Sequence, residues 1–176
     1  EITTSSTKPS GRNRTGSLVY DGKMIICGGG SDGGLLNEVW SLDLTTYVWT
    51  QLTTTNPKPA GRQIDDIILY NDKLWLFGGV IGTTYENDVW FLDLTTYAWT
   101  EITPSGTLPN SRQKHTTSIF NGNMILFGGY RSGGAYVNDS WYLNLTTYAW
   151  NKLTTSSPIP SIRSNPMSTI YDGYMY

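Results

Sequence analysis

Residues 87–100 read NDVWFLDLTTYAWT, and this segment decides the fold because it occurs three times. Residues 37–50 read NEVWSLDLTTYVWT, and residues 138–151 read NDSWYLNLTTYAWN. Successive copies begin 50 and 51 residues apart. A period near 50 residues is typical of β-propeller blades, and internal repetition of this kind outweighs any shorter motif.

Each repeat is predicted to form four short strands. Aromatic and β-branched residues fill the predicted strands, which in the second copy cover 63–70, 73–77, 87–94 and 98–102. Pairs such as Asp21-Gly22 and Asn71-Asp72 predict tight hairpins between the first two strands. Asp43, Asp93 and Asn144 open the turn before the fourth strand, where their side chains are expected to accept backbone N–H groups.

The second strand of each repeat is apolar on both faces. In the second copy it reads Leu74-Trp75-Leu76-Phe77, and it is followed by Gly78-Gly79, which we expect to end the strand. A strand of this kind needs cover on both sides. Blades stacked around an axis provide that cover, so the sequence predicts an all-β propeller segment of four-stranded antiparallel blades.

The repeat resembles the kelch repeat. It has a run of apolar residues, a double glycine, a variable stretch, and then a tryptophan that is followed by a second one nine positions later. Arg112 and His115 resemble the form found in galactose-oxidase-like kelch sequences. The other copies have Thr15, Asp65 and Pro166 where the third has histidine, so the resemblance implies no ring of histidines. The resemblance covers essentially the whole chain.

The repeats divide the chain into five parts. We expect the end of a preceding blade, three whole blades with their linking loops, and the start of a further blade, at 1–9, 10–52, 53–102, 103–153 and 154–176. Closed propellers of the kelch type have about 4–8 blades. The chain is therefore expected to be part of a longer polypeptide.

Composition excludes two classes of partner. Twelve Lys and Arg face fourteen Asp and Glu, giving a net charge of −2, which does not fit a polybasic nucleic-acid binder. The longest apolar runs are far shorter than the ~20 residues that span a bilayer, so no membrane insertion is expected. Low charge and three matches to the N-glycosylation acceptor, at Asn13, Asn138 and Asn144, favour a secretory origin, with a cytoplasmic location as the alternative.

Two sets of long loops are predicted to share one face of the propeller. The loops between the second and third strands cover 30–36, 80–86 and 130–137, and the linkers between blades cover 3–11, 53–61, 103–111 and 154–162. These loops differ between copies, and binding residues concentrate on such loops. The candidate binding residues are Arg14, Asp32, Tyr85, Lys114, His115, Tyr130, Arg131 and Tyr136. The alternatives are polar groups facing channel water, and aromatic rings folded onto their own blades.

Other motifs favour structural roles. The recurring Arg12, Arg62, Arg112 and Arg163 are expected to donate to loop carbonyls, and the recurring tryptophans to pack between blades. Residues 28–33 spell G-x-G-x-x-G, but a strand rather than a helix follows, so no nucleotide site is predicted. Asp65 and His115 could meet on neighbouring blades, yet two ligands are too few for a metal site. The lone Cys27 is expected to be a buried, inert thiol.

These observations favour a non-enzymatic interaction or scaffolding module, with no cofactor and with a protein or peptide as partner. One alternative is a secreted propeller of the galactose-oxidase-like or carbohydrate-binding kind. Another alternative is a structural part of a larger filament or appendage.

Overall fold

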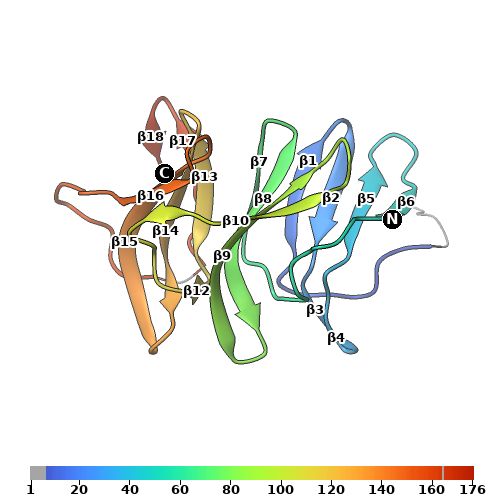
Figure 1. Ribbon diagram of the computed structural model, residues 1–176, viewed down its shortest axis with the longest axis horizontal. Helices are drawn as coiled ribbons and strands as arrows, with labels where there is room; N and C mark the ends of the chain where they lie inside the picture. Colours follow the sequence, from blue (N-terminus) through green and yellow to red (C-terminus); the bar gives the residue numbers. More distant parts are fainter. Residues whose placement is uncertain (1–6, 164) are drawn as a thin grey trace.

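The computed structural model describes residues 7–163 and 165–176. Within these residues it contains strands and turns but no helix. Figure 1 labels the strands, which are β1 Gly16–Tyr20, β2 Lys23–Cys27, β3 Gly30–Ser31, β4 Gly34–Leu35, β5 Val39–Asp43, β6 Trp49–Leu52, β7 Ile67–Tyr70, β8 Lys73–Ile81, β9 Thr84–Asp93, β10 Trp99–Ile102, β11 Ser105–Gly106, β12 Arg112–Gln113, β13 Thr116–Phe120, β14 Asn123–Arg131, β15 Ala135–Asn144, β16 Ala149–Lys152, β17 Ile170–Tyr171 and β18 Tyr174–Met175.

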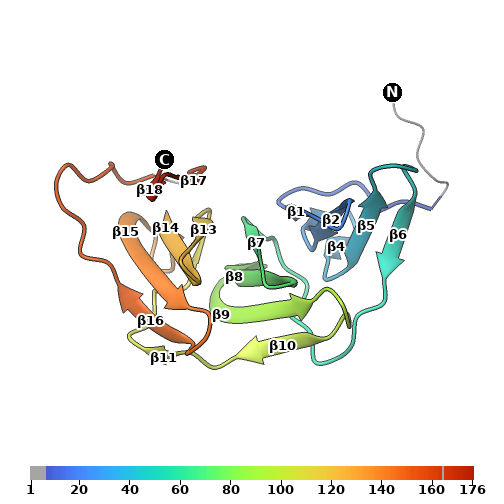
Figure 2. The same ribbon diagram turned by 90° about the horizontal axis from the view of Figure 1, so that it is seen from above.

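Three antiparallel sheets stand side by side as three blades. The first blade has the strand order β1-β2-β5-β6, and the second has β7-β8-β9-β10. In the third, β12 and β13 both pair with β14, which is followed by β15 and β16. Figure 2 shows the blades fanned into an arc, with β1, β7 and β13 toward its concave side. This architecture confirms the predicted all-β propeller segment.

The linkers tie each blade to the next. After β10 leaves the second blade, β11 pairs in parallel with β16, the outer strand of the third blade. Thr55 makes the equivalent parallel bridge to Ala98, next to β10. Backbone polar groups of each linker are thereby paired with the outer strand of the following blade. The linker also covers the exposed edge of that strand.

The hydrophobic core lies between the blades. Leu74 and Leu76 of β8 pack with Ile25, Val39 and Trp90 in the cluster between the first and second blades. The alternate residues of the same strand, Trp75 and Phe77, pack with residues of the third blade in a second cluster. Successive side chains of a strand point to opposite faces. The continuous apolar sequence of β8 therefore contributes to two inter-blade interfaces. The predicted packing of tryptophans between blades is confirmed.

The double glycines do not end the second strand in two of the blades, contrary to the prediction. β8 and β14 continue past them, and the pairing register shifts where the glycines form a bulge. Gly79 has a φ of 97°, and a Cβ at this position would lie 2.5 Å from the carbonyl oxygen of Gln63. A left-handed backbone so close to another chain segment requires glycine. Only β2 ends where expected, at Cys27.

The predicted loops 80–86 and 130–137 are hairpins instead. β8 and β9 stay paired as far as Ile81 and Thr84, and β14 and β15 as far as Arg131 and Ala135. In the first blade, β3 and β4 form a separate short hairpin in the predicted loop 30–36. The glycine bulge lets the ladder resume through residues that favour strands, such as Val80, Ile81 and Tyr85.

The innermost strand also begins later than predicted. β7 starts at Ile67 rather than at residue 63, although Gln63 still bridges to Val80. In the third blade the strand breaks at Lys114, which has a φ of 58°, and Arg14 has a φ of 49° at the equivalent position of the first. Non-glycine residues rarely adopt this conformation. This backbone conformation therefore occurs at the concave edge of both the first and the third blade.

The turns before the fourth strands form as predicted. The Oδ1 atom of Asp43 accepts hydrogen bonds from the backbone N–H groups of Thr45 and Thr46 at 2.9 and 2.8 Å. Asp93 and Asn144 do the same in the other blades. An amide oxygen replaces a carboxylate oxygen in the third turn without changing its geometry.

Candidate interaction face

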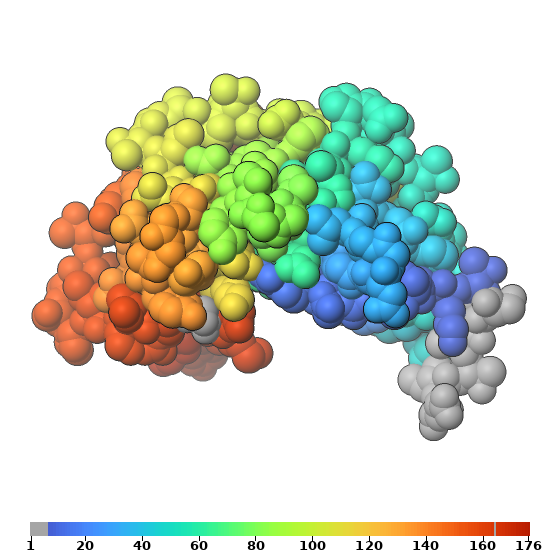
Figure 3. Space-filling model, turned by 90° about the horizontal axis from the view of Figure 1, so that it is seen from below, coloured from blue at the N-terminus to red at the C-terminus, as the bar shows by residue number. Residues whose placement is uncertain are grey.

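The hairpin ends and the linkers between blades lie on the same face of the molecule. Asn87 and Asn138, which lie in the second strand of their hairpins, donate their side-chain N–H groups to the linker carbonyls of Pro109 and Pro160. Figure 3 shows this face, with the hairpins of the three blades side by side in blue, green and orange. The tight turns between the first two strands of each blade lie at the opposite end (Figure 1). We call the surface of hairpins and linkers the loop face.

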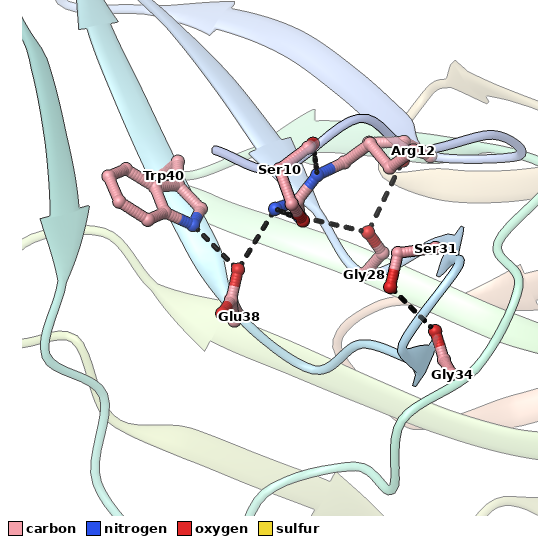
Figure 4. Close-up of polar contacts among 8 residues, drawn as sticks. Ser10, Arg12, Gly28, Ser31, Gly34, Glu38 and Trp40 are labelled. Carbon is pink, nitrogen blue, oxygen red and sulfur yellow. Dashed lines mark hydrogen bonds and ion pairs between the residues drawn. The ribbon is translucent and has the colours of Figure 1, made fainter. Parts of the chain in front are cut away.

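A buried arginine, a carboxylate and a tryptophan recur beneath the loop face. In the second blade, Arg62 Nη1 lies 2.6 Å from Asp88 Oδ1, and Trp90 Nε1 donates to Asp88 Oδ2 at 2.8 Å. Figure 4 shows the equivalent group of the first blade, in which Glu38 joins Arg12 to Trp40. The third blade uses Arg112, Asp139 and Trp141.

These arginines also make the predicted bonds to loop carbonyls. Arg112 is fully buried and donates to the carbonyls of Asn110 and Gly128, at 3.1 and 3.0 Å. Burial alone would raise the pKa of Asp139, but hydrogen bonds from Arg112 and Trp141 and nearby positive charge hold it below its ordinary value. The carboxylate partner was not predicted, although an acidic residue precedes Val-Trp or Ser-Trp in every copy. The side chain of Arg163 differs because it is exposed and, within the described residues, donates only to Ser161.

Three predicted site residues form an aromatic cluster on the loop face. Tyr130 and Tyr136 are cross-strand partners in the hairpin of the third blade, with ring centroids 4.8 Å apart. Tyr85, from the hairpin of the second blade, meets Tyr130 edge to face at 6.0 Å. Tyr136 remains 48% exposed. The cluster therefore spans two blades and still presents an aromatic surface to solvent.

Arg14 is already engaged by other side chains. It donates to Gln63 Oε1 at 2.5 Å, to Asp65 Oδ1 at 2.7 Å and to Gln113 Oε1 at 2.6 Å. Its partners belong to the second and third blades, so one guanidinium joins three blades. Gln63 and Gln113 were not among the predicted residues, although each directly follows a recurring arginine. A ligand that binds Arg14, as predicted, would have to add a hydrogen bond to this network or displace one of its side chains.

His115 is buried just before β13 in the third blade. It is 3% exposed, its ring stands edge-on to Phe77, and burial lowers its pKa to about 4. Neither of its ring nitrogens has a hydrogen-bond partner among the described residues, and the same holds for Asp65 Oδ2. Asp65 and His115 were predicted to meet, but within that part of the chain they form no hydrogen bond with each other. Desolvation strongly disfavours the imidazolium, so His115 is neutral at neutral pH.

Asp66 faces the other way from Asp65 and joins the second blade to the third. Its Oδ2 accepts hydrogen bonds from the backbone N–H and hydroxyl of Thr117, at 2.6 and 3.0 Å. Burial raises the pKa of this carboxyl despite those bonds. The two neighbouring aspartates therefore make different contacts, Asp65 with Arg14 and Asp66 with Thr117.

The remaining predicted residues lie apart from these groups. Asp32 is exposed at the turn between β3 and β4, and Lys114 is half-buried at the break in the innermost strand. Arg131 is exposed at the end of β14, where it lines a hollow together with Tyr136. Cys27 is buried, and burial raises the pKa of its thiol to about 12, so it is an inert core residue.

Two overlapping segments of the chain match one family model. Residues 1–121 and 58–176 each match the model described as the KLHDC2/KLHL20/DRC7 Kelch-repeats domain. The chain belongs to the kelch-repeat family. Domains of kelch repeats are generally protein-interaction modules. No curated protein matches the chain.

Neither a membrane-spanning helix nor a cluster of metal ligands occurs in the described part of the chain. Within residues 7–163 and 165–176, no helix is long and apolar enough to cross a membrane. In the same residues, no three side chains of the His, Cys, Asp or Glu type are grouped closely enough to hold a metal ion.

Proposed function

We propose that this kelch-repeat chain is a non-enzymatic interaction module that binds a protein or peptide through its loop face. The aromatic cluster of Tyr85, Tyr130 and Tyr136 carries this proposal. Tyrosine is enriched at protein interfaces because it offers a large apolar area and a polar tip at small entropic cost.

The contrast between framework and loop face supports the same function. The arginine, carboxylate and tryptophan beneath the face occur in each whole repeat, whereas the cross-strand pairs above them differ. Those pairs are Gly30 with Leu35, Val80 with Tyr85, and Tyr130 with Tyr136. A constant scaffold that carries variable hairpins is the arrangement expected of a binding surface.

Quantitative affinity capture from extracts of the source tests the proposal. We expect Tyr136→Ala to weaken retention of specific partners, because it removes an exposed anchor from the face. Tyr47→Ala is the matched control, since Tyr47 is 39% exposed in a turn at the other end of the molecule. Equal retention by both variants, with both folded, contradicts the assignment of the loop face.

The other functions remain predictions. No contact described above favours the galactose-oxidase-like or carbohydrate-binding propeller, or the filament component, over the interaction module.

A further inference from the structure

The third blade has two basic residues on its loop-face rim that the other repeats lack. Arg131 stands two residues after the double glycine, where the other repeats have Ser31 and Ile81. Lys152 is the cross-strand partner of the blade tryptophan, where the others have Gln51 and Glu101. The fold forms around neutral and acidic residues at these positions, so it does not require basic ones.

Both basic residues line one hollow at the rim of the loop face. The hollow has a volume of about 290 Å³, and its walls include Asn110, Arg131, Tyr136 and Lys152. The ammonium group of Lys152 lies 5.7 Å from the ring centroid of Trp141, which supports the side chain beside the hollow. The most exposed ring of the aromatic cluster, Tyr136, therefore borders a basic hollow.

The positive charge of this hollow is offset only in part, because Lys152 helps to lower the pKa of Asp139 without forming an ion pair with it. Among the described residues, neither Arg131 nor Lys152 forms an ion pair. The carboxylate in the wall, Asp139, is occupied on both oxygens by Arg112 and Trp141. A chain with a net charge of −2 thus concentrates unpaired positive charge beside an exposed aromatic ring.

We infer that the rim hollow is a subsite for a carboxylate side chain of the partner protein, next to an apolar side chain that packs on Tyr136. This inference rests on the proposed function, because it specifies the chemistry of the partner that the loop face binds. The guanidinium of Arg131 can donate two parallel hydrogen bonds to a planar carboxylate, while Lys152 contributes a point charge. Charge complementarity at such a site fixes the register of a partner more than it adds to raw affinity.

Peptide selection on the immobilised full chain tests the subsite and does not require an identified partner. A random-sequence phage library is expected to yield peptides with Asp or Glu beside an apolar or aromatic residue. The selected peptide and its version with Gln in place of Glu are then measured for binding. We expect the amide version, and the double variant Arg131→Gln/Lys152→Gln, each to weaken binding at least about tenfold, which corresponds to about 1.4 kcal/mol.

Matched controls separate the subsite from general electrostatics. Lys23→Gln/Lys73→Gln removes two positive charges at the tight-turn end and is expected to leave binding unchanged. Sodium acetate is expected to compete with the peptide more effectively than sodium chloride at the same ionic strength, because general screening is then equal. Equal competition by the two salts would overturn the carboxylate assignment.

The outcomes distinguish this inference from the proposed function. Binders that map to the loop face but lack acidic residues, or that tolerate the double variant, overturn the carboxylate subsite alone. Binders that map elsewhere, or a selection that yields no binder, contradict both.

Discussion

At the scale of single residues, one carboxylate in each whole blade neutralises one arginine beneath the loop face. Arg62 and Arg112 are 3% and 0% exposed, and each has its counter-ion within 2.7 Å. A buried pair of this kind is not strong evidence of stability by itself. Its importance appears when one member is removed, because the remaining charge stays buried without a partner.

Asp88→Ala is therefore expected to reduce the free energy of unfolding by about 3–5 kcal/mol. The variant leaves the Arg62 guanidinium without its carboxylate and the Trp90 N–H without its acceptor. Asp88→Glu should cost much less, because the first blade builds the same group with Glu38. Urea denaturation compares the two variants. A loss below about 1 kcal/mol for Asp88→Ala would show that water replaces the carboxylate easily.

His115 makes the stability depend on pH. Its pKa is about 4 in the folded protein and 6.5 for the ordinary side chain, chiefly because burial disfavours the charged form. The unfolded chain therefore takes up a proton before the folded one does as the pH falls. The contribution of His115 to the free energy of unfolding is fully present above pH 6.5, and it falls by about 3 kcal/mol between pH 6.5 and about 4.

Denaturation of the native protein and of His115→Gln across this range measures the effect. The difference in free energy of unfolding between the two proteins should shift with pH in favour of the variant as the medium becomes acidic. The comparison cancels the opposite contribution of Asp66, whose raised pKa makes its ionisation unfavourable in the folded state. A difference that does not vary with pH contradicts the buried, neutral state of His115.

At the scale of elements, a tyrosine ends each turn before the fourth strand in an unusual backbone conformation. Tyr47, Tyr97 and Tyr148 have φ values of 58°, 57° and 57°. The left-handed region costs a residue with a side chain roughly 1–2 kcal/mol, and asparagine tolerates it better than tyrosine. Tyr148 offsets this cost by packing on Trp75 of the preceding blade, at a ring distance of 6.3 Å.

Equivalent substitutions in two of these turns should therefore have different effects on stability. Tyr148→Asn loses the inter-blade ring contact and is expected to destabilise the fold by about 2 kcal/mol. Tyr47 is 39% exposed, so Tyr47→Asn should leave stability unchanged or raise it slightly. Thermal denaturation of the two variants decides the matter. Equal losses would mean that the backbone conformation, rather than the ring contact, selects tyrosine.

Sequence reasoning was most successful where a single element determines its own structure. The turn at Asp43 and the alternation of Leu74 and Trp75 between two cores follow from local chemistry and strand periodicity. The predicted end of the strand at Gly78 was wrong, because a double glycine suits a strand end and a bulge equally well. The approach of Tyr85 to Tyr130, and the carboxylate partner of Arg112, depend on how hairpins and blades meet in space, which one sequence does not reveal.

At the scale of the whole molecule, the blades are joined by polar contacts as well as by their hydrophobic interfaces. Arg14 of the first blade bonds Gln63 and Asp65 of the second and Gln113 of the third. The side chain of Asp65 is 6% exposed, so its charge depends on Arg14 for compensation. Contacts between successive repeats set how cooperatively a repeat protein unfolds.

Arg14→Ala is accordingly expected to destabilise all three blades together. Removing the guanidinium leaves Asp65 buried without a counter-ion and frees Gln113, so amide hydrogen exchange should accelerate along β1, β7 and β13. Asp65→Asn in the same chain should restore part of the loss, because the uncompensated charge disappears. Arg163→Ala, which removes an exposed arginine side chain, is the control and should change nothing. Faster exchange confined to β1 would mean that the network holds Arg14 in place without coupling the blades.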